Sequence, residues 1–125
     1  MYLVTGAGGQ IGKKLCEVLS KEIGPERLIA TDMAETKPDE VADSTYYQLD
    51  VRDSKKFENL VTKHKVTKLV HLAAIVSALG EKPGNFDLAY SVNVGGAMNA
   101  FTLAREHGCS VFLPTSIACF GGTAY

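Results

Sequence analysis

The stretch Val4-Thr5-Gly6-Ala7-Gly8-Gly9-Gln10-Ile11-Gly12 places Gly6, Gly9 and Gly12 at a GxxGxxG spacing near the N-terminus. An apolar run precedes it, and apolar residues at helical spacing follow it. A strand, a glycine turn and a helix in this order present backbone N–H groups and the helix dipole to an anion. We therefore predict a dinucleotide site, with a sharp turn at Gly6, close approach to the pyrophosphate at Gly9 and close helix packing at Gly12.

An acidic residue roughly 20 residues further on is the third requirement of a dinucleotide site. The run Leu28-Ile29-Ala30-Thr31-Asp32 provides it. A carboxylate there accepts hydrogen bonds from the adenosine ribose and repels the extra phosphate of NADP, and no arginine follows closely to compensate. NAD is therefore the favoured cofactor, although a simple cap or turn role for Asp32 stays open.

The composition describes an ordinary globular domain spanning residues 1–125. Thirteen basic and fourteen acidic side chains give a net charge of −1, which does not favour nucleic acid or an anionic membrane as a partner. The first strand begins directly after Met1, so we expect a cytoplasmic protein without a leader. The three cysteines and three histidines share no ligand spacing, so we predict no metal site.

Strand and helix patterns alternate along the chain, which predicts an α/β fold: a Rossmann-type, doubly wound parallel sheet in the order 3-2-1-4-5. After the first strand, strands are expected at 27–31, 46–49, 68–72 and 111–113. Helices are expected at 10–23, after a cap at Asp53 or Ser54, and at 86–107, where Gly108 suits the left-handed position at the C-terminal end. Segments 33–45 and 75–84 are expected to be loops. Ligand should bind between strands 1 and 4, where the strand order reverses.

Four further residues are candidates for chemistry. Asp50 ends the third strand and is expected to accept from the adenine amino group, although a plain loop acid fits nearly as well. His71 lies within an apolar strand pattern, where a core histidine is commoner than a catalyst. Ser116 and Thr115 follow the fifth strand at the ligand-binding edge of the sheet, where a turn or cap role is an equal alternative.

The chain resembles the extended short-chain dehydrogenases/reductases, the group that includes nucleotide-sugar epimerases and dehydratases. The resemblance covers essentially the whole chain. Within this family, the runs after the fourth and fifth strands look most like the L-threonine 3-dehydrogenase branch. The resemblance to the family rests on the glycine motif, Asp32, Asp50-Val51, His71-Leu72-Ala73-Ala74, Asn93-Val94 and Leu113-Pro114-Thr115-Ser116-Ile117-Ala118-Cys119-Phe120-Gly121.

The resemblance implies a role for each matching residue. NAD would be held through its pyrophosphate, ribose and adenine, with small side chains beneath it. The implied NAD-binding residues are Gly6, Gly9, Gln10, Ile11, Gly12, Asp32, Asp50, Val51, Leu72, Ala73, Ala74 and Asn93. Ser77 and Thr115 would lie near a small-molecule substrate, and Ser116 would orient the reacting alcohol or carbonyl as a catalytic residue.

The resemblance also implies a tyrosine base with a lysine four residues later, and the chain departs from that pattern. Tyrosines stand at positions 2, 46, 47, 90 and 125, and no Tyr-x-x-x-Lys pair occurs. We therefore expect the N-terminal portion of a longer, homodimeric enzyme, truncated after strand 5 and without activity by itself. A nucleotide-sugar epimerase or dehydratase, and a non-catalytic NAD-binding module, remain alternatives.

Overall fold

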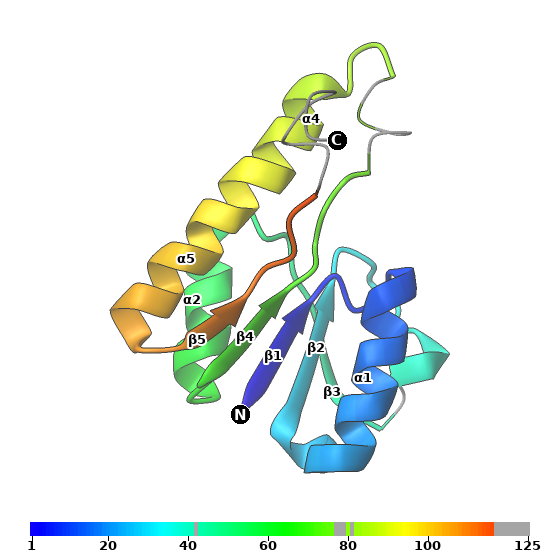
Figure 1. Cartoon of the computed structure of the whole chain (residues 1–125), viewed down its shortest axis with the longest axis vertical. Coiled ribbons are helices and arrows are strands. Elements are labelled where there is room, and N and C mark those ends of the chain that lie inside the picture. The colour runs from blue at the N-terminus through cyan, green and yellow to red at the C-terminus, as the bar shows by residue number, and fades with distance from the viewer. Residues whose placement is uncertain (42, 77–79, 81, 117–125) are drawn as a thin grey trace, which may run out of the picture.

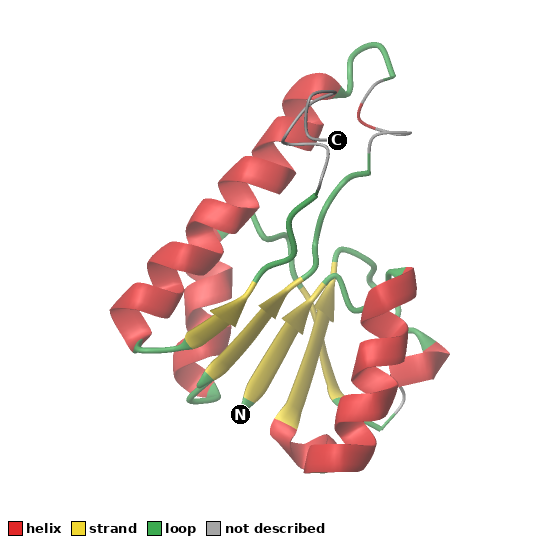
Figure 2. Cartoon of the chain, viewed as in Figure 1, coloured by secondary structure: helices red, strands yellow, loops and turns green. Residues whose placement is uncertain are grey.

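The computed structural model describes residues 1–41, 43–76, 80 and 82–116. Within this part of the chain, five parallel strands form one sheet in the order β3-β2-β1-β4-β5 (Figure 1, Figure 2). This confirms the predicted Rossmann-type order, and the strand bounds differ from the predicted ones by about one residue. The strands are β1 (Tyr2–Thr5), β2 (Leu28–Asp32), β3 (Thr45–Gln48), β4 (Lys68–His71) and β5 (Ser110–Phe112).

Helices cover the two faces of the sheet, as Figure 1 shows. Helix α1 (Gln10–Ile23) packs on one face, and α2 (Ser54–Lys63) and α5 (Gly96–His107) pack on the other. Because successive residues of a strand point to opposite faces, Leu3 belongs to the core under α2 and α5, and Val4 belongs to the core under α1. Both side chains are fully buried, as expected for a central parallel strand.

The helix ends follow local signals in the sequence. Asp53 caps α2 by accepting from the backbone N–H of Lys56 at 3.0 Å. Gly108 ends α5 in the left-handed region, with φ of 68°, as the sequence predicts. No helix in the described residues is both long enough and apolar enough to cross a membrane.

The predicted long helix at 86–107 contains an irregularity that its sequence pattern does not reveal. It begins as α4 (Phe86–Tyr90), widens into a π-helical segment, η3 (Ser91–Gly95), and continues as α5. The expected loop at 33–45 likewise contains a short 3₁₀ turn, η2 (Asp39–Val41), and another, η1 (Pro25–Arg27), precedes β2. A π segment inserts one residue into the helical turn and often lies at a functional site.

The strand register brings three functional segments to one edge of the sheet. In β1, Thr5 lies opposite Thr31 of β2 on one side and opposite His71 of β4 on the other. The glycine turn follows β1, Asp32 ends β2, and Leu72 follows β4. These segments therefore meet at the carboxyl edge, where the sheet order reverses between β1 and β4.

Candidate dinucleotide-binding site

The glycine turn after β1 has the conformation that its sequence predicts. Gly6 has a φ of +70°, which is strained for any residue with a side chain, and a Cβ there would lie 2.7 Å from the backbone nitrogen of Ala73. A Cβ on Gly12 would lie 2.1 Å from the carbonyl oxygen of Gly6. The turn therefore touches the segment after β4, and α1 starts directly against the turn.

The N-terminus of α1 opens toward the same edge of the sheet. The N-cap residue is Gly9, and no side chain caps the helix. The first N–H groups of an α-helix have no partner within the helix, and the helix dipole adds positive potential there. The residues in this turn thus fit an anionic group such as a pyrophosphate.

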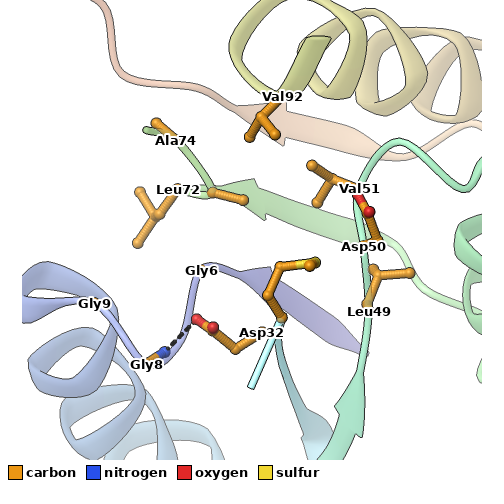
Figure 3. Close-up of a pocket in the computed structure, with 12 residues that line it drawn as sticks. Gly6, Gly8, Gly9, Asp32, Leu49, Asp50, Val51, Leu72, Ala74 and Val92 are labelled. Atoms are coloured by element: carbon orange, nitrogen blue, oxygen red, sulfur yellow. Dashed lines mark hydrogen bonds between the residues drawn. The ribbon is translucent and has the colours of Figure 1, made fainter. Parts of the chain in front are cut away.

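Asp32 lies beside the turn. Its Oδ2 accepts the backbone N–H of Gly8 at 2.8 Å, drawn as a dashed line in Figure 3, and its Oδ1 accepts that of Ala34 at 3.3 Å. A Cβ on Gly8 would lie 3.0 Å from Oδ2, so a larger residue there would crowd the carboxylate. Asp32 is therefore held at the end of β2 with acceptor capacity left for a ligand's hydroxyl groups.

A cavity of about 390 Å³ lies between these segments (Figure 3). The lining residues come from the turn after β1, the end of β2 and the residue after it, the segments after β3 and β4, and η3. Eight of the twelve predicted NAD-binding residues are among them: Gly6, Gly9, Asp32, Asp50, Val51, Leu72, Ala73 and Ala74. The crevice between strands 1 and 4 thus lies where the sequence predicts it.

Four predicted residues do not line this cavity. Gln10 and Ile11 line a groove on the outer face of α1, where 70% of Ile11 is exposed. Gly12 packs against the turn, and Asn93 lies at a neighbouring cavity.

Four lining residues were not predicted: Gly8, Met33, Leu49 and Val92. Gly8, Met33 and Leu49 adjoin predicted residues in sequence, which is the signal that could have found them. Val92 lies in η3, and it reaches the cavity only because the fold places this helical segment beside the crevice.

The carboxylate of Asp50 is already engaged by a neighbouring cation. Arg52 Nε lies 3.0 Å from both carboxylate oxygens, and Nη2 lies 2.6 Å from Oδ2. Hydrogen bonding from the Arg52 side chain lowers the pKa of Asp50. This pairing leaves less acceptor capacity for adenine than the sequence suggests.

Asn93 holds the segment that follows β4. Its side-chain oxygen accepts the N–H of Ile75 at 2.7 Å, and its side-chain nitrogen donates to the Ile75 carbonyl at 2.9 Å. Asn93 lies in η3, so the π-helical segment carries a clamp on a wall of the crevice. A smaller cavity of about 90 Å³ lies beside it, lined by His71, Leu72, Ala73, Ala74, Asn93, Ala97, Leu113 and Pro114.

The predicted substrate and catalytic positions are only partly described. Thr115 and Ser116 are exposed and follow β5, beyond Leu113 and Pro114, which line the smaller cavity. Ser77 lies outside the described residues. Their roles remain predictions. The histidines do not gather at the crevice, but His107 lies 3.3 Å from Glu58, and Glu106 is near both, in an exposed cluster between α2 and α5.

Comparison with known proteins agrees with this geometry. The model of the NAD dependent epimerase/dehydratase family matches residues 2–124. This chain belongs to that family. NAD, which the sequence predicts as the cofactor, is the one that the family description names.

An enzyme with a named activity is similar to the chain over nearly all of its length. A mitochondrial L-threonine 3-dehydrogenase of Sus scrofa is 34% identical over 122 residues, which are 98% of this chain and 32% of the relative. The chain thus spans about a third of the length of that relative.

Two solved structures place the chain within the family's fold. A monomeric L-threonine 3-dehydrogenase from a metagenome, in its apo form, is 38% identical and superposes with a TM-score of 0.89, covering 98% of this chain and 38% of that one. A UDP-glucose 4-epimerase of Thermus thermophilus in complex with NAD is 28% identical, with a TM-score of 0.73, over 88% of this chain and 35% of that one.

Proposed function

We propose that this chain is the NAD-binding portion of an NAD-dependent oxidoreductase whose substrate is L-threonine. The observation that carries the cofactor assignment is the position of the Asp32 carboxylate, bonded to Gly8 in a turn that opens an uncapped helix. A ribose acceptor and a pyrophosphate cradle therefore share one wall of the cavity. The oxidation would convert L-threonine to 2-amino-3-ketobutyrate.

Different residues of the crevice would bind different parts of the cofactor. Gly6, Gly9 and the backbone N–H groups of Gln10 and Ile11, in the first turn of α1, would hold the pyrophosphate. Asp32 would hold the adenosine ribose. Asp50 and Val51 would face the adenine. Leu72, Ala73 and Ala74 would pack beneath the remaining part of the cofactor. Asn93 would hold the segment at Ile75, which follows them. When bound, NAD supplies the hydride acceptor.

Substrate oxidation would need more than these residues provide. Ser116 would orient the alcohol, with Thr115 and Ser77 near the substrate. The family tyrosine that takes the hydroxyl proton requires a nearby cation to lower its pKa, and this chain has no Tyr-x-x-x-Lys pair. We therefore expect the 125-residue chain to bind NAD without turning over substrate.

Among the solved structures whose names give a substrate, the greater similarity to the threonine dehydrogenases supports L-threonine over a nucleotide sugar. The threonine dehydrogenases above share 34–38% identity with the chain, against 28% and a lower TM-score for the epimerase. An epimerase or dehydratase is the second candidate, because the family includes both activities. A non-catalytic NAD-binding module is the third, and it is favoured by the missing tyrosine–lysine pair.

Calorimetric titration with NAD and NADP tests the cofactor assignment. We expect micromolar NAD binding and weaker NADP binding, and tighter NADP binding would refute the role of Asp32.

Two chimeras test the substrate, with residues 1–125 replacing the matching segment of a threonine dehydrogenase or of a UDP-glucose 4-epimerase. Turnover of L-threonine by the first and no epimerisation by the second supports the proposal. The reverse result would contradict it.

The full-length form is proposed to be a homodimer through α5. Met98 and Phe101 of this helix are 58% and 46% exposed, which supports an apolar contact surface. Light scattering on a full-length form tests the proposal, and a monomer, like the metagenomic relative, would contradict it.

A further inference from the structure

Three polar side chains cross the sheet in one row just below the crevice. Thr31, Thr5 and His71 occupy paired positions on β2, β1 and β4, and their exposed fractions are 0%, 0% and 3%. The row faces α5, because a Cβ on Gly96 would lie 3.7 Å from Cε1 of His71. Polar groups so deeply buried require hydrogen-bond partners.

The hydrogen bonds of Thr5 determine which nitrogen of His71 carries the proton. The Thr5 hydroxyl oxygen accepts the backbone N–H of Ala73 at 3.3 Å and lies 2.9 Å from Nδ1 of His71. If Nδ1 carried the proton, the Thr5 hydroxyl proton would have no acceptor among the described residues. The arrangement that satisfies Thr5 has its hydroxyl donating to Nδ1, so the proton of the neutral imidazole is on Nε2.

The other ring nitrogen of His71, Nε2, is unfavourable for folding. Nε2 is buried and has no hydrogen-bond partner among the described residues. An unpaired buried N–H opposes folding, so an apolar side chain such as that of Leu69, on the same strand, would suit this position better for stability alone. What the imidazole offers, and leucine does not, is the acceptor at Nδ1.

The acceptor at Nδ1 bears on the crevice through Thr5. With its proton directed to His71, the Thr5 oxygen presents a lone pair to Ala73 N–H. Ala73 lines the cavity, and its nitrogen lies 2.7 Å from the place of a Cβ on Gly6. The Thr5–Ala73 bond therefore joins the glycine turn to the opposite wall at their point of contact.

We propose that His71 is a positioning residue for the dinucleotide site: as the acceptor for Thr5, it orients the hydroxyl that holds Ala73 against the Gly6 turn. The inference rests on the proposed NAD binding for its effect on affinity, but the hydrogen-bond relay itself exists without ligand. His71 touches no ligand in this role and acts only through Thr5.

Two substitutions at position 71 separate positioning from simple packing. In His71→Asn, the side-chain oxygen can replace Nδ1 as acceptor, although the smaller side chain leaves a void. In His71→Leu, the site is filled but the acceptor is lost. We expect Leu to be the more stable variant in urea unfolding, yet to bind NAD about tenfold more weakly, as for the loss of one positioning hydrogen bond. Asn should keep most of the affinity.

Thr5→Val and Thr31→Val form the matched control. Each removes one fully buried hydroxyl from the same row, but the Thr31 hydroxyl donates to the Val4 carbonyl at 3.1 Å and does not contact His71. Only Thr5→Val should weaken NAD binding as His71→Leu does. Equal affinity of the Leu and Asn variants, or equal loss in both threonine variants, would overturn the proposal.

Two measurements without ligand keep the inference separate from the proposed function. Imidazole ¹⁵N shifts of the unliganded protein should show His71 protonated on Nε2, and protonation on Nδ1 would overturn the relay. Amide exchange at Ala73 should accelerate in His71→Leu and not in His71→Asn. If both measurements give the expected results but the unsubstituted protein does not bind NAD, the proposed function is wrong. The hydrogen-bond relay is then still supported.

Discussion

The backbone N–H of Gly8 donates to Oδ2 of Asp32 over 2.8 Å, and this bond joins the glycine turn to the end of β2. The two residues are 24 positions apart in the chain. Because the bond uses only part of one carboxylate, Asp32 is oriented without being saturated. Asp32 lines the same cavity as Gly6 and Gly9.

Replacement of this carboxylate should change both affinity and cofactor choice. Asp32→Asn removes the charge and half of the acceptor capacity, so we expect NAD binding to weaken about tenfold, the effect of losing a charge-assisted hydrogen bond. NADP should lose less, because its 2′-phosphate is no longer repelled. Calorimetry with both cofactors measures the ratio. Asp53→Asn, at the cap of α2, serves as the control and should leave both affinities unchanged.

The helix and turn contact at Gly12 should be intolerant of a single methyl group. In Gly12→Ala the Cβ would meet the Gly6 carbonyl oxygen at 2.1 Å and the Ala7 Cα at 2.8 Å, both backbone atoms. We expect a loss of about 2 kcal/mol or more in the free energy of unfolding. Gly95→Ala is the matched control, since nothing lies within 4 Å of its Cβ. It should stabilise by about 0.5 kcal/mol in urea unfolding, and equal losses would contradict the packing assigned to Gly12.

The Asn93 clamp should be visible at the backbone amide of Ile75. Asn93→Ala removes both bonds to Ile75, so amide exchange there should rise roughly tenfold. Asn99→Ala is the comparison, because Asn99 donates instead to the carbonyls of Val51 and Arg52. Unchanged exchange at Ile75 in the first variant would show that the clamp does not hold this segment.

Burial of His71 should make stability depend on pH. Burial lowers the pKa of His71 from 6.5 to about 4. Between these values the unfolded chain binds a proton that the folded chain does not, so the free energy of unfolding falls as the pH drops from about 6.5 to about 4. The His71 contribution is about 3 kcal/mol over that window, and it levels off below it.

Urea unfolding at a series of pH values measures this dependence, with His71→Leu as the reference. The variant should lack the His71 contribution and keep that of His64, whose pKa is also lowered, chiefly by burial. Parallel curves for the two proteins would contradict the assignment. Protonation of Asp50, whose pKa is lowered by hydrogen bonding from the Arg52 side chain, should reduce stability further at more acidic pH.

The sequence by itself determined the order of the strands and the main features of the site. The glycine spacing acts through local steric limits at Gly6 and Gly12. The acid at the end of β2 and the apolar runs of strand length are also local features, and the runs reflect burial of both faces of β1 and β2. Such local constraints can be read without coordinates. For the same reason the sequence predicts Gly108 at the end of α5 and limits the cap of α2 to Asp53 or Ser54.

Only the tertiary structure decided which side chains face one another. The pairing of Asp50 with Arg52, the π-helical segment that aims Asn93 at Ile75, and the row from Thr31 through Thr5 to His71 depend on register and rotamers. Arg52 is only two residues from Asp50, but its side-chain rotamer decides the pairing. The Asn93–Ile75 bonds and the buried Thr5–His71 bond join residues that are distant in sequence, so only the fold brings them together. In the sequence, His71 matches an ordinary core residue of its strand. The positioning role proposed for it depends on Thr5 and Ala73, which only the fold places beside it.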